Sequence, residues 1–128
     1  MAGTQTISIE RNIDAANRFL ERVAALTPAE RERISTESFG SPAHTSALFS
    51  TADEITTVRN RDREGRVSSF LVDVERRVDG LGLSAEVGGL VKAATRAILV
   101  HDLPGRERAT RQLYSPFDSV VPLQSVVD

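Results

Sequence analysis

The sequence predicts an all-α fold, a single-domain bundle of five or six helices. Apolar residues recur at helical spacing along most of the 128 residues, and helix-capping patterns precede several of these stretches. The only strand-like alternation covers residues 6–9, which is too short to specify a sheet. No segment of disordered composition divides the chain, so we assign one domain over residues 1–128. Residues 1–10 form its N-terminal tail, which we expect to be flexible or only loosely docked.

The first predicted helix covers about residues 12–26, where apolar side chains form one stripe. Residues 27–30 then match a capping box, in which a threonine and a glutamate three positions later satisfy each other's backbone N–H groups. Pro28 stands at the first helical position, where its missing N–H has no consequence. This pattern predicts a short polar helix that ends near Gly40.

Two further helix starts follow in the sequence. Ser41 precedes Pro42, and Thr51 precedes Glu54 in a second capping-box pattern. The pattern leaves open whether residues 27–58 form two short helices or one kinked helix.

The strongest helical pattern lies in the middle of the chain. Residues 66–79 and 84–101 each carry an apolar stripe, and Ser84 is a suitable N-cap for the second segment. The intervening loop is short and contains Gly80 and Gly82. Two long helices joined in this way pack antiparallel, so we expect a central αα-hairpin around which the bundle is built.

The C-terminal part predicts a short helix from Pro104 to Tyr114 and one more turn from Ser115. The apolar residues 120–123 follow, and we expect this tail to lie along the bundle rather than to extend into solvent.

Composition excludes several classes of function. The chain has no cysteine, which excludes disulfides, thiolate metal sites and cysteine nucleophiles, and no motif for a nucleotide or metal cofactor is present. The net charge of −2 does not favour bulk attraction to nucleic acid or to an anionic membrane. Because no secretion signal or membrane-spanning stretch is recognisable and 15 of 16 basic residues are arginine, we expect a cytoplasmic, bacterial protein without a cofactor.

Two adjacent glycines interrupt the second hairpin helix, although each lowers helix stability by about 1 kcal/mol relative to alanine. Gly89 is followed by Ala93 and Ala97, so these three residues form a smooth ridge on one helix face. The ridge permits close contact with another helix of the same chain. It also permits a subunit interface or a narrow ligand slot.

The two histidines have different surroundings in the sequence. His101 and Asp102 follow the most apolar helix, so they are candidates for a general base oriented by a carboxylate beside a ligand pocket. The simpler interpretation is that His101 interacts with the negative end of the helix dipole. We expect His44 to be a surface residue.

Arginines form two clusters that are candidates for nucleic-acid contacts. The acidic residues interleaved in each cluster favour a solvated surface instead. The first cluster consists of Arg59, Arg61, Arg63 and Arg66, and the second consists of Arg106, Arg108 and Arg111.

The absence of a catalytic constellation beside a well-patterned core predicts a non-enzymatic interaction module. We expect it to self-associate as a homodimer or to bind a protein partner. The first alternative is a regulator or accessory factor that binds nucleic acid through the arginine clusters. The second is a small-ligand or enzymatic protein with a pocket near His101.

Overall fold

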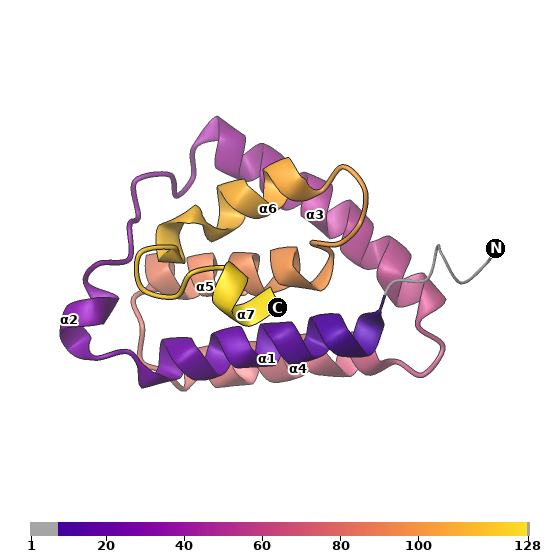
Figure 1. Ribbon diagram of the computed structural model, residues 1–128, viewed down its shortest axis with the longest axis horizontal. Helices are drawn as coiled ribbons and strands as arrows, with labels where there is room; N and C mark the ends of the chain where they lie inside the picture. Colours follow the sequence, from indigo (N-terminus) through magenta and orange to yellow (C-terminus); the bar gives the residue numbers. More distant parts are fainter. Residues whose placement is uncertain (1–7, 128) are drawn as a thin grey trace.

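A computed structural model describes residues 8–127 of the chain and confirms the all-α prediction (Figure 1). Over these residues it contains helices and no strand. Within residues 8–127, five helices have eight or more residues, and two short α-helices and one 3-10 helix, η2, accompany them. The bounds are α1 Ile9–Ala25, α2 Pro28–Arg31, α3 Pro42–Arg61, α4 Arg66–Asp79, α5 Ala85–Leu99, α6 Glu107–Tyr114, η2 Ser115–Phe117 and α7 Gln124–Val127.

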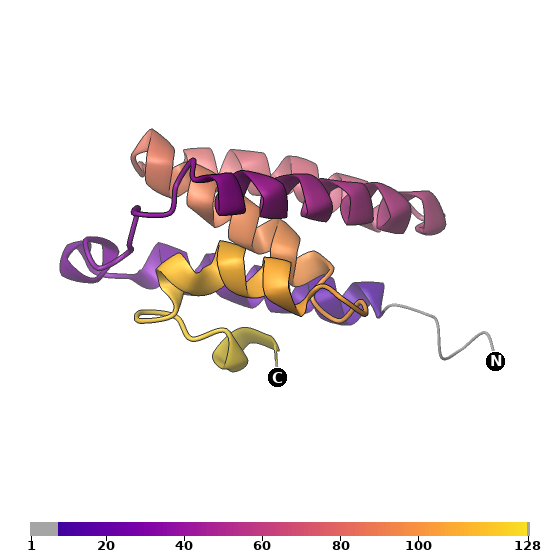
Figure 2. The same cartoon turned by 90° about the horizontal axis from the view of Figure 1, so that it is seen from above.

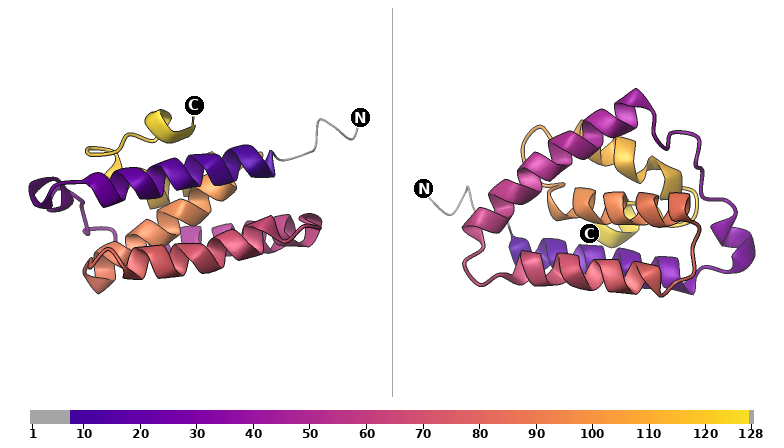
Figure 3. Two further views of the ribbon diagram at one scale, coloured as in Figure 1. Left: turned by 90° about the horizontal axis from the view of Figure 1, so that it is seen from below. Right: turned by 180° about the vertical axis from the view of Figure 1, so that it is seen from behind.

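The long helices form two layers with α5 passing between them. α3 and α4 make up one layer, and α1 and α6 make up the other, as Figure 2 shows. Figure 3 shows that α5 starts beside the end of α4 and runs obliquely to the layer of α1. It therefore packs against all four of the other long helices.

α5 is the centre of the hydrophobic core. Nine of its residues are buried, including Leu90, Val91 and Ile98, which are fully enclosed. The predicted hairpin with α4 is present, and the Ser84 side chain caps α5 by accepting a hydrogen bond from the Val87 N–H at 3.2 Å. Because α5 also contacts α1, α3 and α6, this one helix, rather than the hairpin as a pair, organises the bundle.

An aromatic cluster joins the C-terminal tail to the core. The Phe19 ring lies 5.2 Å from the Tyr114 ring and 5.1 Å from the Phe117 ring. The buried Tyr114 hydroxyl donates a hydrogen bond to the carbonyl of Val121 at 2.6 Å, and Arg18 of α1 donates two to the carbonyl of Val126. The prediction that the tail lies along the bundle is therefore confirmed.

The region between α1 and α3 differs from the prediction. The capping box at Thr27 is present, but the helix that it starts ends at Arg31 and does not continue to Gly40. Ile34 turns into the core instead, and the Ser35 N–H donates to the carbonyl of Pro116 at 3.3 Å. Residues 32–40 are mostly polar, and burial of the Ile34 side chain stabilises this docked loop more than further helical turns would.

α3 is one continuous helix of 20 residues, which begins at the predicted Ser41 cap. The second predicted start is wrong, because Thr51 lies within the helix and only 2% of its surface is exposed. The prediction of a surface His44 is also wrong, since its exposure is 3%. Both residues lie on the inward face with Ala47 and Ile55, and these two polar positions hid the apolar stripe in the sequence.

Smaller differences concern the helix ends. α6 begins at Glu107 rather than at Pro104, and Ile9 and Glu10 belong to α1 although they were assigned to the N-terminal tail. The rest of that tail, residues 1–7, lies outside the described residues. None of the helices between residues 8 and 127 combines the length and the apolar character that a bilayer crossing requires.

The buried phenol of Tyr114 makes the stability of the fold depend on pH at alkaline values. Burial raises its pKa above the ordinary value of about 10, so the folded state holds the phenolic proton more tightly than the unfolded chain does. The free energy of unfolding therefore keeps this contribution below about pH 10 and loses it as the pH rises further. Tyr114 is the only tyrosine and tryptophan is absent, so tyrosinate absorbance reports on this group alone.

We expect tyrosinate absorbance to appear at high pH only together with loss of helical circular dichroism. In urea the same group is expected to titrate near pH 10. A titration near that pH in the folded protein, with the helix signal unchanged, would contradict the burial of Tyr114.

Candidate functional site

His101 and Asp102 serve to close the C-terminal end of α5. The His101 Nδ1–H donates to the carbonyl of Ile98 at 2.8 Å, and the buried Asn12 amide of α1 donates to the carbonyl of Leu99 at 3.1 Å. The same Asn12 amide nitrogen donates to Asp102 Oδ1 at 2.9 Å. The last carbonyls of a helix lack intrahelical partners, and these side chains satisfy two of them.

The candidate catalytic pair is therefore not assembled as a dyad in the described chain. His101 bonds to the backbone of its own helix and Asp102 bonds to Asn12, so neither orients the other. The sequence interpretation did not single out Asn12. Its signal was an amide within the apolar stripe of the first helix, beside Ala15 and Ala16.

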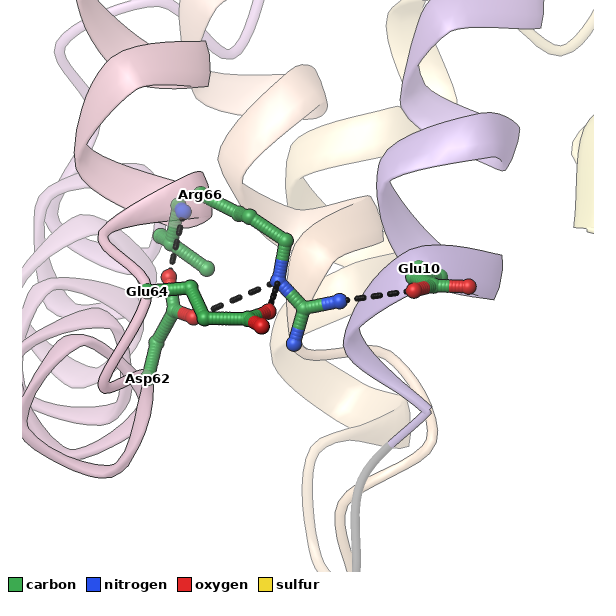
Figure 4. A network of polar contacts seen from close by, with 5 residues as sticks. Glu10, Asp62, Glu64 and Arg66 are labelled. Carbon is green, nitrogen blue, oxygen red and sulfur yellow. Dashed lines mark hydrogen bonds and ion pairs between the residues drawn. The ribbon is translucent and has the colours of Figure 1, made fainter.

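Arg66 of the first arginine cluster is surrounded by carboxylates (Figure 4). Its guanidinium lies 2.8 Å from Glu10, 3.0 Å from Glu64 and 3.5 Å from Asp62. The buried Asp62 carboxylate also accepts a 2.6 Å hydrogen bond from the Val67 N–H, at the N-terminus of α4. Asp62, another residue that the sequence did not single out, therefore connects the α3–α4 turn to α4, and Arg66 connects that turn to α1.

The other arginines of the two clusters are distributed differently. Arg59 donates to Ser68 Oγ at 3.2 Å, and Arg106 donates to the hydroxyl and carbonyl oxygens of Ser50. Arg61 and Arg63 are exposed, as are Arg108 and Arg111 on α6. The side chains of Arg66 and Arg106 are thus engaged by the protein itself, which reduces the charge that the clusters offer to phosphates.

The glycine–alanine ridge of α5 points toward three different neighbours. Ala93 and Ala97 are buried in a small cluster with Ala47 of α3 and Leu113 of α6. Gly89 faces the ring of Phe39, and a Cβ added there would lie 3.3 Å from Phe39 Cε1. The ridge is therefore filled by side chains of the same chain.

The outward side of α3 is the most unusual surface of the described residues. Phe49 is 70% exposed, and the stretch Pro42–Ala52 around it contains no aspartate, glutamate, lysine or arginine. We define the α3 face as the exposed residues that repeat along the outside of this helix: Thr45, Phe49, Ala52 and Thr56.

A groove lies on each side of the α3 face. The first, of about 340 Å³, runs between α3 and α6 and is lined mainly by small side chains such as Ala43, Ser46 and Ala109. The second, of about 450 Å³, is bordered by α3, α4 and α5. Its walls include Ile55 and Leu71, and we call it the α3–α4 groove.

The α3–α4 groove contains a buried polar group without a partner. Thr51 lines the groove, and its hydroxyl oxygen is buried with no hydrogen-bond partner. A buried hydroxyl without a partner is unfavourable, so this threonine is not explained by the stability of the fold. Arg59 and Arg96 line the same groove and give it a basic border.

The grooves lack the groups that general acid–base or metal chemistry requires. Neither lining includes aspartate, glutamate, histidine, cysteine or tyrosine. Over residues 8–127, no three or more histidine, cysteine, aspartate or glutamate side chains cluster so that they could hold a metal ion. The arrangement provides apolar contact area with hydroxyl and guanidinium groups at its borders, which suits binding.

No family model, curated protein or solved structure matches this chain.

Replacement of Asn12 by alanine tests its connection between α1 and α5. The change leaves the buried Leu99 carbonyl without its donor, so we expect the free energy of unfolding to fall by about 1–3 kcal/mol. Urea unfolding followed by circular dichroism measures this. Glu21→Ala, an exposed position on the same helix, is the control and is expected to change stability by less than about 0.5 kcal/mol. Equal effects of the two changes would exclude the proposed role of Asn12.

Two buried threonines provide a matched test of the unpartnered hydroxyl. Thr51 has no partner, whereas the Thr95 hydroxyl donates to the carbonyl of Val91 at 2.7 Å. Thr51→Val removes an unsatisfied group, so we expect unfolding to require about 1 kcal/mol more free energy. Thr95→Val removes a made hydrogen bond, and we expect stability to fall by up to about 1 kcal/mol. Urea midpoints that shift equally in the same direction would contradict the assignment.

Proposed function

We propose that the protein is a non-enzymatic interaction module that binds another protein surface through the α3 face. The observation that carries this proposal is the 70% exposure of Phe49 within an uncharged helical stretch. Depletion of charge together with an exposed aromatic side chain is the compositional signature of the centre of a protein interface. Folding alone does not explain it, because an exposed position accepts lysine or glutamate with little change in stability.

The other exposed apolar side chains lack this setting. Val72 on α4 is 65% exposed, but the neighbours on its face of the helix include Glu75 and Arg76. Phe39 is 41% exposed, and its ring packs against Gly89 of α5. Isolated exposed apolar residues are ordinary, whereas the α3 face continues into two grooves.

The alternatives receive less support from the geometry. Arg66 and Arg106 are held within the chain, and no observation explains the α3 face through nucleic-acid binding. His101 and Asp102 line neither groove and are engaged at the end of α5. The excess of arginine over lysine supports a bacterial source, and a cytoplasmic location remains a prediction of the sequence.

A photo-crosslinking amino acid tests the proposed surface. We expect benzoylphenylalanine in place of Phe49 to form covalent adducts with another protein when cells of the source organism that express the variant are irradiated. The same group in place of Val72 has similar exposure and is expected to form none. Gel mobility and mass spectrometry measure the adducts. Absence of adducts at position 49, or equal yields at both positions, would exclude the α3 face as the binding surface.

A further inference from the structure

We propose that the α3–α4 groove is a binding site for a small organic acid with a single carboxylate on an extended aliphatic chain. The groove adjoins the α3 face, but this inference goes beyond the protein-binding function proposed above and does not depend on it. Three observations carry it: the apolar walls of the groove, the charge at its border and the unpartnered hydroxyl of Thr51.

The groove has the dimensions and the walls that an aliphatic chain requires. α3 and α4 diverge from the turn that joins them, as Figure 3 shows, and the groove is bordered by these two helices and by α5. The lining follows α3 from Leu48 to Arg59, which is about 16 Å of helix. An extended chain advances about 1.2 Å per bond, so a chain of about eight to ten carbons fits along it. The aliphatic part of the lining comes from all three helices and includes Leu48, Ile55, Leu71 and Ala93.

Arg59 is the cation of the groove that no carboxylate neutralises. Its Nε donates to Ser68 Oγ at 3.2 Å, and within residues 8–127 it forms no ion pair. The two terminal nitrogens of its guanidinium are therefore left for a ligand. Asp53 and Glu54, the acidic residues of α3, are not part of the groove lining.

Arg96 adds a second guanidinium from α5, but its charge is balanced nearby. It lies 3.8 Å from Glu75, which is closer to Lys92 at 2.9 Å, and Lys92 also lies 3.5 Å from Asp79. The two cations and the two carboxylates of this group carry no net charge. Arg59 then leaves an excess of one positive charge at the groove, which a carboxylate balances and a doubly charged phosphate exceeds.

Thr51 supplies an uncharged hydrogen-bond donor at the same groove. Its hydroxyl oxygen is buried without a partner, whereas a valine would make the same apolar contacts and leave no polar atom unsatisfied. A group that lowers stability in this way is expected where it serves a function. A carboxylate oxygen of the ligand accepts a hydrogen bond from this hydroxyl and from the two guanidinium groups, so binding removes the cost of the unsatisfied group.

Calorimetric titration of the full-length chain with octanoate tests the site. We expect saturable one-to-one binding with a dissociation constant below about 1 mM. Acetate keeps the carboxylate without the chain and octan-1-ol keeps the chain without the charge, and each is expected to bind at least about tenfold more weakly. Absence of saturable octanoate binding, or equal binding of octan-1-ol, would overturn the inference. Tighter binding of octyl phosphate than of octanoate would overturn the assignment of a carboxylate.

Arg96→Gln and Arg76→Gln form a matched pair of variants. Each arginine has one ion pair, at 3.8 Å, but only Arg96 lines the groove. We expect Arg96→Gln to raise the dissociation constant of octanoate at least about tenfold, the effect of losing a charge-assisted hydrogen bond, and Arg59→Gln to do the same. Arg76→Gln is expected to leave it unchanged, and all three variants should unfold near the wild-type urea concentration. Equal affinities of the Arg96 and Arg76 variants would overturn the site.

Thr51→Val separates binding from stability. We expect it to raise the dissociation constant of octanoate about fivefold while the chain becomes more resistant to urea, because one change removes both the ligand's donor and the unsatisfied group. A purely structural role of Thr51 would not move the two measurements in opposite senses. Thr95→Val, at a buried threonine outside the groove lining, is the control and is expected to leave octanoate binding unchanged. Wild-type affinity in Thr51→Val would overturn the assignment of this hydroxyl to the ligand.

Discussion

The burial of α5 is the constraint on which the rest of the structure depends. A helix with nine buried residues must be enclosed by its neighbours, and α1, α3, α4 and α6 are arranged around it for this reason. The last carbonyls of a helix lack partners within the helix, and at the end of α5 two of them, those of Ile98 and Leu99, accept hydrogen bonds from side chains. Asn12 donates to the Leu99 carbonyl and His101 donates to the Ile98 carbonyl. Asp102 accepts a hydrogen bond from the same Asn12 amide, so His101 and Asp102, the candidate catalytic pair, are both engaged at this helix end.

The same enclosure leaves α3 at the outside with one face in contact. α3 contributes Ala47, Ile55 and Val58 to the interior, and its opposite side lies between two grooves. A helix in this position normally carries charged side chains toward water. The substitution of small and aromatic residues for charged ones along three turns is therefore a property of the surface, which the packing of the core does not require.

The sequence predicted the parts of the fold that are determined locally. The bounds of α4, the Ser84 cap and the Thr27 capping box follow from patterns within a few residues, and all are present. The end of α2 was not predictable in this way, because the docking of Ile34 in the core depends on tertiary contacts. α3 was divided wrongly because its inward stripe includes His44 and Thr51, polar residues whose burial the sequence pattern does not reveal.

The candidate site was hidden by a related difficulty, since the sequence shows that Phe49 is apolar but not which way it points. An aromatic residue at helical spacing is more often in the core, and only the position of α3 in the bundle turns it outward. Once its exposure is known, the uncharged neighbours become informative. Charge at those positions would leave the core intact and improve solubility, so the uncharged surface supports the proposal that the α3 face binds another protein.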